Sequence, residues 1–195
     1  MGALRGQNDS VIEFHRRSKK REAWQAAGWL DAASTNLETI MHFRIKGLSA
    51  EQFQPLFGLP EMELERLGIK RYVVDKQPGF PDRVALTDAD IGETVLLLNH
   101  VCQPAQNAYR ASHAIFVREG PGKTFDAINQ VPESLRLRLL SLRAYDKDHM
   151  MIDADLVEGT SIETLIEKLF ANELVSYIHV HNARRGCYAA RIDRA

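Results

Sequence analysis

The sequence predicts an α+β fold in which a mainly antiparallel sheet, built of hairpins, has a few helices packed on one face. Short apolar runs bounded by glycine, proline and aspartate recur along residues 41–195, which is typical of strands and turns. Pairs of such runs joined by tight turns outnumber strand–helix–strand units, and hairpins build antiparallel sheets. Only a few segments carry apolar residues at helical spacing.

Length and composition favour one globular domain. The chain has 195 residues, of which 45% are hydrophobic and 26% are charged, and both fractions are ordinary for a globular protein. Residues 41–195 are expected to form a single α+β domain. Residues 1–40 contain a basic run and poorly phased apolar residues, so they are expected to form a loosely attached or disordered N-terminal extension.

Charge and cysteine content exclude several classes of protein. The formal net charge is −1, so no nucleic acid partner is expected, because phosphate binding needs clustered, uncompensated Lys and Arg. No apolar run reaches the roughly 18 residues of a membrane helix, and the N-terminus lacks the apolar core of a secretory signal. Two cysteines are too few for a disulfide framework. We therefore expect a soluble, cytoplasmic protein of bacterial type.

The first half of the domain alternates strands with short helices. A strand is expected at residues 43–47. Ser49 and Gln52 form a capping-box signature for a helix over residues 50–57, and Pro60 and Gly68 bracket a second helix over residues 61–67.

Strands dominate the middle of the chain. They are expected at residues 69–75, 83–86, 94–99 and 114–118. The strand at residues 94–99 is rich enough in Leu and Val to be buried on both faces. A polar loop is expected over residues 100–112.

The last third begins with an ambiguous segment, residues 132–140, for which we favour a helix. Strands follow, which we place at residues 141–145 and 150–157 around a turn. The clearest helix comes next, because Thr160 and Glu163 form a capping box before an apolar stripe at helical spacing. A terminal hairpin is expected, with strands at residues 175–182 and 187–193.

Two histidines on this hairpin form a candidate metal site. His179 and His181 point to the same face of a strand, and two neighbouring imidazoles form a chelating pair for a divalent transition metal. A third ligand must come from another segment, and the candidates are His100, His113 and His149. Alternatively, the pair consists of half-buried histidines that are hydrogen-bonded to their neighbours.

The hairpin turn is a candidate anion site. Backbone N–H groups of a tight turn over residues 182–186, together with Arg184 and Arg185, are suited to a phosphate or a carboxylate. Arg110 and Ser112, in the expected polar loop, offer donors of the same kind. The alternative is a solvated turn that binds nothing.

Cys187 follows two arginines and a glycine, and positive charge favours a nucleophilic thiolate. If the turn has an even number of residues, Asn182 pairs with Cys187 and His181 with Tyr188. The histidines then lie on the opposite face from the thiol, whereas an odd turn or a bulge reverses this. The alternative role of Cys187 is a small core residue.

Three strings resemble the bacterial domain-of-unknown-function 1203 family. They are YRASHAIFVRE (residues 109–119), SLRAYD (residues 141–146) and HVHNARRGCYAAR (residues 179–191). The resemblance runs from about residue 41 to residue 195 and implies no established activity. It also has two departures: Asp82 stands where the family often has a cysteine, and Arg185 where it often has a proline.

These observations lead to one hypothesis and one alternative. The hypothesis is a domain that binds a small anionic molecule in a polar pocket, formed by the terminal hairpin and residues 100–112. The alternative is a metal-dependent enzyme that uses the His179 and His181 pair. The predicted ligand-binding residues, all within the matching strings, are Arg110, Ser112, Arg143, His179, His181, Asn182, Arg184 and Cys187.

Overall fold

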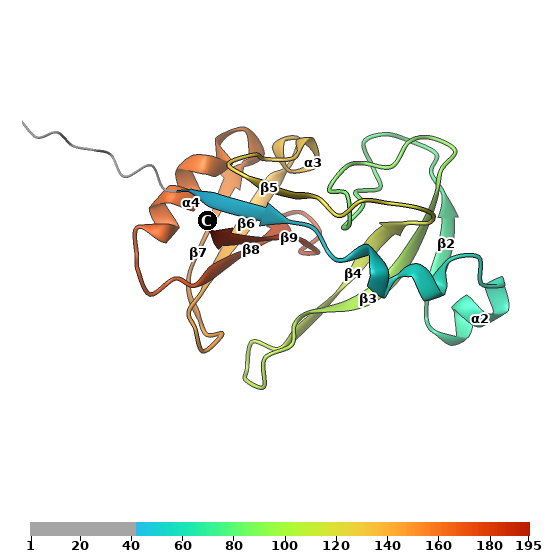
Figure 1. The fold of residues 1–195 in the computed structure, drawn as a ribbon, viewed down its shortest axis with the longest axis horizontal. Coiled ribbons are helices and arrows are strands. Elements are labelled where there is room, and N and C mark those ends of the chain that lie inside the picture. Colours follow the sequence, from blue (N-terminus) through green and yellow to red (C-terminus); the bar gives the residue numbers. More distant parts are fainter. Residues whose placement is uncertain (1–41) are drawn as a thin grey trace, which may run out of the picture. The chain divides into compact units, whose positions relative to one another are not determined.

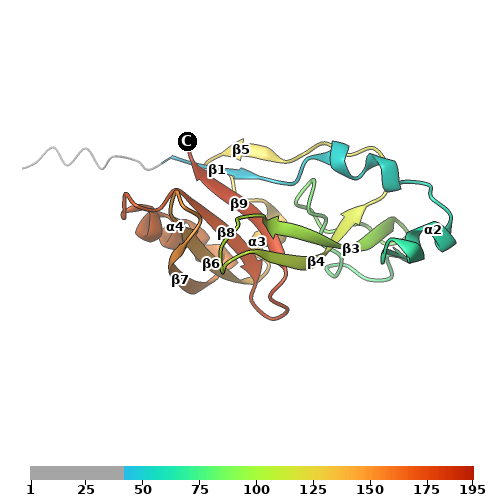
Figure 2. The ribbon, with the colours of Figure 1, turned by 90° about the horizontal axis from the view of Figure 1, so that it is seen from below.

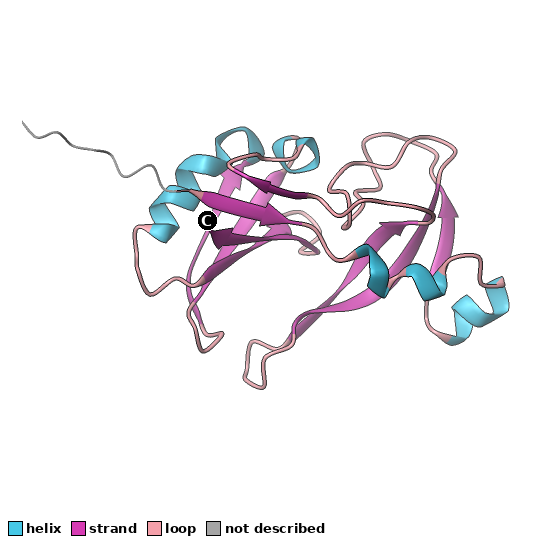
Figure 3. Cartoon of the chain, viewed as in Figure 1, coloured by secondary structure: helices cyan, strands magenta, loops and turns pink. Residues whose placement is uncertain are grey.

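The computed structural model describes residues 42–195, and the predicted extension at residues 1–40 lies outside them (Figure 1). The described part consists of two sheets, in which all named strands pair antiparallel, and a few short helices (Figure 3). The predicted α+β class is therefore confirmed, although the strands form two sheets rather than one. Within residues 42–195, no helix has the length and hydropathy of a membrane-spanning segment.

The larger sheet has six strands in the order β5-β1-β9-β8-β6-β7 (Figure 2). Its strands are β1 (Phe43–Lys46), β5 (Asp126–Ile128), β6 (Leu139–Tyr145), β7 (Met151–Glu158), β8 (Tyr177–Asn182) and β9 (Tyr188–Arg194). The terminal hairpin β8–β9 therefore lies at the centre of the sheet. Strand β5 was not predicted, because three residues are too few to show an alternating pattern.

Helices α3 (Glu133–Arg136) and α4 (Ile162–Phe170) pack on one face of this sheet. The apolar stripe of α4 is buried as predicted, in a core shared with Ile178 and Val180 of β8. The predicted capping box is wrong. A short turn, η3 (Gly159–Ser161), precedes the helix, no side chain caps it, and Glu163 instead forms an ion pair with Arg136.

The smaller sheet has the order β2-β3-β4 and lies next to α2 (Glu61–Arg66). Its strands are β2 (Lys70–Val73), β3 (Thr94–Gln103) and β4 (Ala111–Arg118). Strand β3 is buried on both faces, as predicted. Val95 belongs to one core cluster with Val74, whereas Leu96 and Leu98 belong to another.

The expected helix over residues 50–57 does not form. Two 3-10 turns, η1 (Ala50–Gln52) and η2 (Gln54–Leu56), replace it, and the Ser49 side chain caps neither. Pro55 explains the break, because it has no N–H group to continue a helical hydrogen-bond ladder.

The polar loop expected over residues 100–112 is shorter than predicted and spans residues 104–110. Strand β3 continues to Gln103 and β4 begins at Ala111, and His100 pairs with His113 across them. His100 and His113 contact Tyr188 and His181 of the larger sheet.

The expected strand over residues 83–86 is absent from the described structure. The segment forms two isolated bridges, Pro81–Asp88 and Asp82–Phe116, and Leu86 has a φ of 54°. The segment is a folded loop that packs between the two sheets. Its Arg83 carbonyl accepts a hydrogen bond from the Leu48 N–H at 2.7 Å.

Gly47 is expected to be essential for this packing. A Cβ on Gly47 would lie 2.1 Å from the Val84 carbonyl oxygen, and backbone cannot move aside cheaply. Gly47→Ala should therefore lower the free energy of unfolding by at least about 2 kcal/mol. Urea denaturation measures this, with Gly122→Ala as the control, because a Cβ there meets nothing within 4 Å. Equal stability of the two variants would contradict the packing described.

Candidate functional site

The β8–β9 hairpin sorts the predicted site residues onto two faces. His181 is paired with Tyr188, and the Asn182 N–H donates to the Cys187 carbonyl at 3.0 Å. This is the register predicted for an even turn. The register of the β8–β9 ladder shifts once, between Val180 and His181, and therefore farther from the turn than the His181–Tyr188 pair. The two histidines therefore lie on the opposite face from the thiol.

The histidine face is an aromatic cluster. His179 and His181 are only 3% and 1% exposed. The rings of Tyr145 and Tyr188 lie 5.0 and 5.1 Å from that of His179. His113, from β4, lies 4.9 Å from His181 between ring centroids. The smaller sheet thus supplies part of the cover over the histidines.

Burial keeps both histidines neutral. Desolvation lowers the pKa of His179 and of His181 to about 3, and nearby cationic groups such as Arg143 add to the effect. Because a carbonyl only accepts, the 3.1 Å contact to Gly186 places the proton of His181 on Nδ1. Nε2 of His181 then carries a free electron pair and has no hydrogen-bond partner among residues 42–195.

Neutral imidazoles can bind a metal ion, but a metal site needs several ligands close together. Nδ1 of His179 and Nε2 of His113 also lack partners in the described chain. Even so, residues 42–195 include no group of three or more His, Cys, Asp or Glu side chains arranged to hold a metal ion. His149 is engaged elsewhere, 2.9 Å from the Tyr177 hydroxyl. The metal-dependent enzyme stays a prediction, which elemental analysis of the purified protein can test.

On the opposite face, Cys187 lies beside two hydrogen-bond donors. Its Sγ is 3.2 Å from Arg83 Nη2 and 3.4 Å from Asn182 Nδ2. Arg83 is 2% exposed, and its Nε donates to the Tyr188 carbonyl at 2.7 Å. Burial lowers the pKa of the Arg83 guanidinium, and the Cys187 sulfur acts in the opposite direction.

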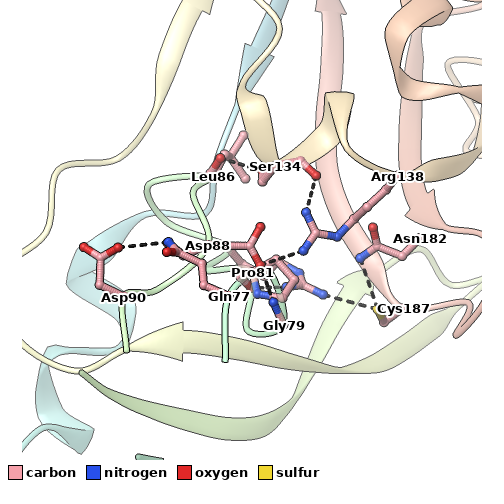
Figure 4. A network of polar contacts seen from close by, with 11 residues as sticks. Gln77, Gly79, Pro81, Leu86, Asp88, Asp90, Ser134, Arg138, Asn182 and Cys187 are labelled. Atoms are coloured by element: carbon pink, nitrogen blue, oxygen red, sulfur yellow. Dashed lines mark hydrogen bonds and ion pairs between the residues drawn. The ribbon is translucent and has the colours of Figure 1, made fainter. Parts of the chain in front are cut away.

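A polar network holds the neighbouring loop in place (Figure 4). Arg138 of the α3–β6 connection forms an ion pair with Asp88 at 2.6 Å, and Asp88 also accepts the Gly79 N–H at 3.0 Å. The Ser134 hydroxyl donates to the Leu86 carbonyl at 2.5 Å. These contacts hold the loop of residues 77–90 against the larger sheet, beside Asn182 and Cys187.

A pocket of about 530 Å³ opens beside the hairpin turn. Its charged lining consists of four cationic side chains and one carboxylate, namely Lys76, Arg138, Arg184, Arg185 and Glu158. Asn182 also lines it. Lys76, Arg184 and Arg185 are exposed and form no ion pair within residues 42–195. The pocket is therefore predominantly cationic.

The structure brings only some of the predicted residues together. Asn182 and Arg184 line the pocket, and Cys187 contacts Asn182 behind it. His179 and His181 lie on the other face. Three further residues are not in the pocket lining: Arg110 donates to the Pro104 carbonyl at 2.8 Å, Ser112 is exposed on β4, and Arg143 pairs with His179 across β6 and β8.

Sequence reasoning missed the residues that complete the pocket. Lys76, Pro78, Gly79 and Pro81 line it in place of the expected 100–112 segment. The turn at Gln77, Pro78 and Gly79 was recognisable, but nothing in it indicates contact with a hairpin a hundred residues later. Arg83 was missed for the same reason.

Residues 79–194 match the model of a family described as "Protein of unknown function (DUF1203)". The match covers more than half of the chain and includes Arg83, Asn182 and Cys187, whereas Lys76 lies outside it. No curated protein and no solved structure matches the chain.

Acid is expected to destabilise the protein before its carboxylates titrate. The unfolded chain binds protons at its histidines near pH 6.5, whereas His179 and His181 in the folded state do so only near pH 3. Stability is therefore lost as the pH falls from about 6.5 towards 3. Between about pH 7 and about pH 5, each of these two histidines should lower the free energy of unfolding by on the order of 1–2 kcal/mol.

Urea unfolding at several pH values between about 7 and 5 measures this loss. In His179→Gln part of the pH dependence should disappear, because one of the two histidines with a pKa of about 3 is gone, while His181, His100 and His113, whose pKa values burial also lowers, keep the rest. An unfolding free energy that is the same at both ends of the range would show that the rings are accessible to protons.

Proposed function

This chain belongs to the DUF1203 family of proteins of unknown function, and we propose that it binds a small anionic molecule in the pocket beside the β8–β9 turn. The observation that carries the proposal is the lining, with four cationic side chains and one carboxylate around about 530 Å³. A pocket of this volume suits a metabolite-sized ligand.

The arginines differ in how firmly they are held. Arg138 is positioned by its ion pair with Asp88 and by a hydrogen bond to the Ser134 carbonyl. A guanidinium held in this way presents a planar fork that matches a carboxylate or a phosphate. Arg184 and Arg185 are exposed at the mouth of the pocket and can close on a bound anion.

The backbone of the turn supports the same ligand. Gly186 has a φ of 69°, and its N–H donates to the Asn182 carbonyl at 2.8 Å, which closes the turn. The N–H groups of Arg184 and Arg185 donate to no group within residues 42–195. Free amides in a tight turn are favourable partners for an anion.

Glu158 narrows the chemistry of the ligand. It is the one carboxylate of the lining and forms no ion pair with another described residue. A carboxylate accepts hydrogen bonds from hydroxyl or ammonium groups. We therefore expect a ligand that carries a carboxylate or phosphate together with a hydroxyl or amino group.

We infer that the protein works in the cytoplasm. Both cysteines are free in the structure. Free thiols persist in reducing compartments, whereas oxidising compartments favour disulfides.

An anionic ligand should raise the melting temperature of the full chain. At about a hundred times its Kd, it adds roughly 2.7 kcal/mol of stability, which corresponds to roughly 5–10 °C for a chain of this size. Differential scanning fluorimetry with phosphate, pyrophosphate, hydroxy acids and amino acid phosphates provides the measurement.

The double variant Arg184→Ala, Arg185→Ala should lose this shift, because it removes two charges and two donors at the mouth of the pocket. Lys46→Ala, Lys123→Ala is the matched control, since both lysines are exposed and neither lines the pocket. If no anion in the set stabilises the wild-type chain, the proposed function is wrong.

A further inference from the structure

Arg83 places a buried positive charge next to a thiol. Among residues 42–195, no carboxylate forms an ion pair with it. The adjacent Asp82 is also 2% exposed, but its carboxylate accepts the N–H groups of Ala85 and Arg118 instead. A buried charge is costly unless an opposite charge lies close by. The Cys187 sulfur, 3.2 Å away, is the atom placed to supply it.

Asn182 connects this thiol with the pocket. Its Nδ2 faces Cys187 Sγ, and its side chain lines both the main pocket and a small void next to Arg83. Its Oδ1 is buried and has no hydrogen-bond partner in the described part of the chain. An unsatisfied acceptor of this kind is open to a donor from a bound molecule. Cys187 itself is partly exposed.

We propose that Cys187 is a nucleophilic thiolate that forms a covalent adduct with a small electrophile bearing a carboxylate or phosphate group. The nucleophile depends on Arg83 and Asn182 alone, whereas the preference for a charged electrophile rests on the proposed anion pocket. In the step, the sulfur electron pair attacks an electrophilic carbon and a C–S bond forms. The bond from that carbon to its leaving group breaks, and the leaving group departs with the electron pair.

Cys102 provides a comparison within the same molecule. It is also partly exposed, but burial raises the pKa of its thiol, and its Sγ lies 3.6 Å from the Ala111 carbonyl. The Cys102 thiol therefore faces an acceptor, whereas the Cys187 sulfur faces two N–H donors.

The first experiment alkylates the full chain with iodoacetamide at about pH 7 and follows each cysteine by peptide mass spectrometry. Cys187 should react at least about tenfold faster than Cys102. Asn182→Ala should slow Cys187 by about tenfold, because it removes one donor to the charged sulfur. Asn99→Ala, an exposed asparagine on β3, is the matched control and should change nothing.

Arg83→Met should slow Cys187 further. Because that variant removes a buried anchor, it is interpreted only if its circular dichroism matches that of the wild type, and Asn182→Ala carries the test otherwise. Equal rates for the two cysteines, or a Cys187 rate unaffected by Asn182→Ala, would overturn the proposal.

The second experiment separates the nucleophile from the anion pocket. Iodoacetate carries a carboxylate, whereas iodoacetamide is neutral. The ratio of the iodoacetate rate to the iodoacetamide rate should therefore be higher at Cys187 than at Cys102. The double variant Arg184→Ala, Arg185→Ala should lower the ratio of the two rates at Cys187 towards that at Cys102, whereas the control Lys46→Ala, Lys123→Ala should leave this ratio unchanged. Fast reaction with iodoacetamide but no preference for iodoacetate would support the nucleophile and count against both the charged electrophile and the proposed function.

Discussion

The buried guanidinium of Arg83 is the constraint on which the arrangement of the two sheets depends. Its backbone N–H donates to the Phe116 carbonyl of β4 at 3.1 Å, and its Nε donates to the Tyr188 carbonyl of β9 at 2.7 Å. One residue therefore bonds to both sheets. Desolvating a guanidinium is costly, so this link exists only because carbonyls and the Cys187 sulfur meet its donors.

The alternation of side chains along β8 gives the two faces of the hairpin opposite electrostatic character. His179 and His181 face aromatic rings and are neutral, because burial penalises their charged form. One residue further, Asn182 faces the other way, towards cations and the thiol. The sheet thus separates the histidine pair from Asn182 and Cys187, although all four residues are close in the sequence. Cys187 therefore cannot serve as a ligand to a metal ion bound by His179 and His181.

Local patterns predicted the elements that are held together by local contacts. The apolar stripe of α4 lies within nine residues and is buried as predicted, and the terminal hairpin has the register of the even-turn alternative. Prediction failed where polar residues are buried by distant segments. His100 suggested a loop, yet it lies on strand β3, where it pairs with His113 and contacts Tyr188 nearly ninety residues away. Residues 83–86 suggested a strand, yet they form a loop in which the Arg83 side chain contacts Tyr188 and Cys187, more than a hundred residues away.

The thiolate and the anion pocket are physically consistent only because of the arginines between them. A thiolate and an anionic electrophile repel each other, and in a partly desolvated site this repulsion amounts to several kcal/mol at contact distance. Arg83 stands next to the sulfur, and Arg184 and Arg185 stand at the mouth of the pocket. With these cations in place, an anion approaching Cys187 enters a net positive field rather than a negative one. A neutral or acidic turn at residues 184–185 would remove two of these cations and weaken the attraction of the proposed pocket for an anionic molecule.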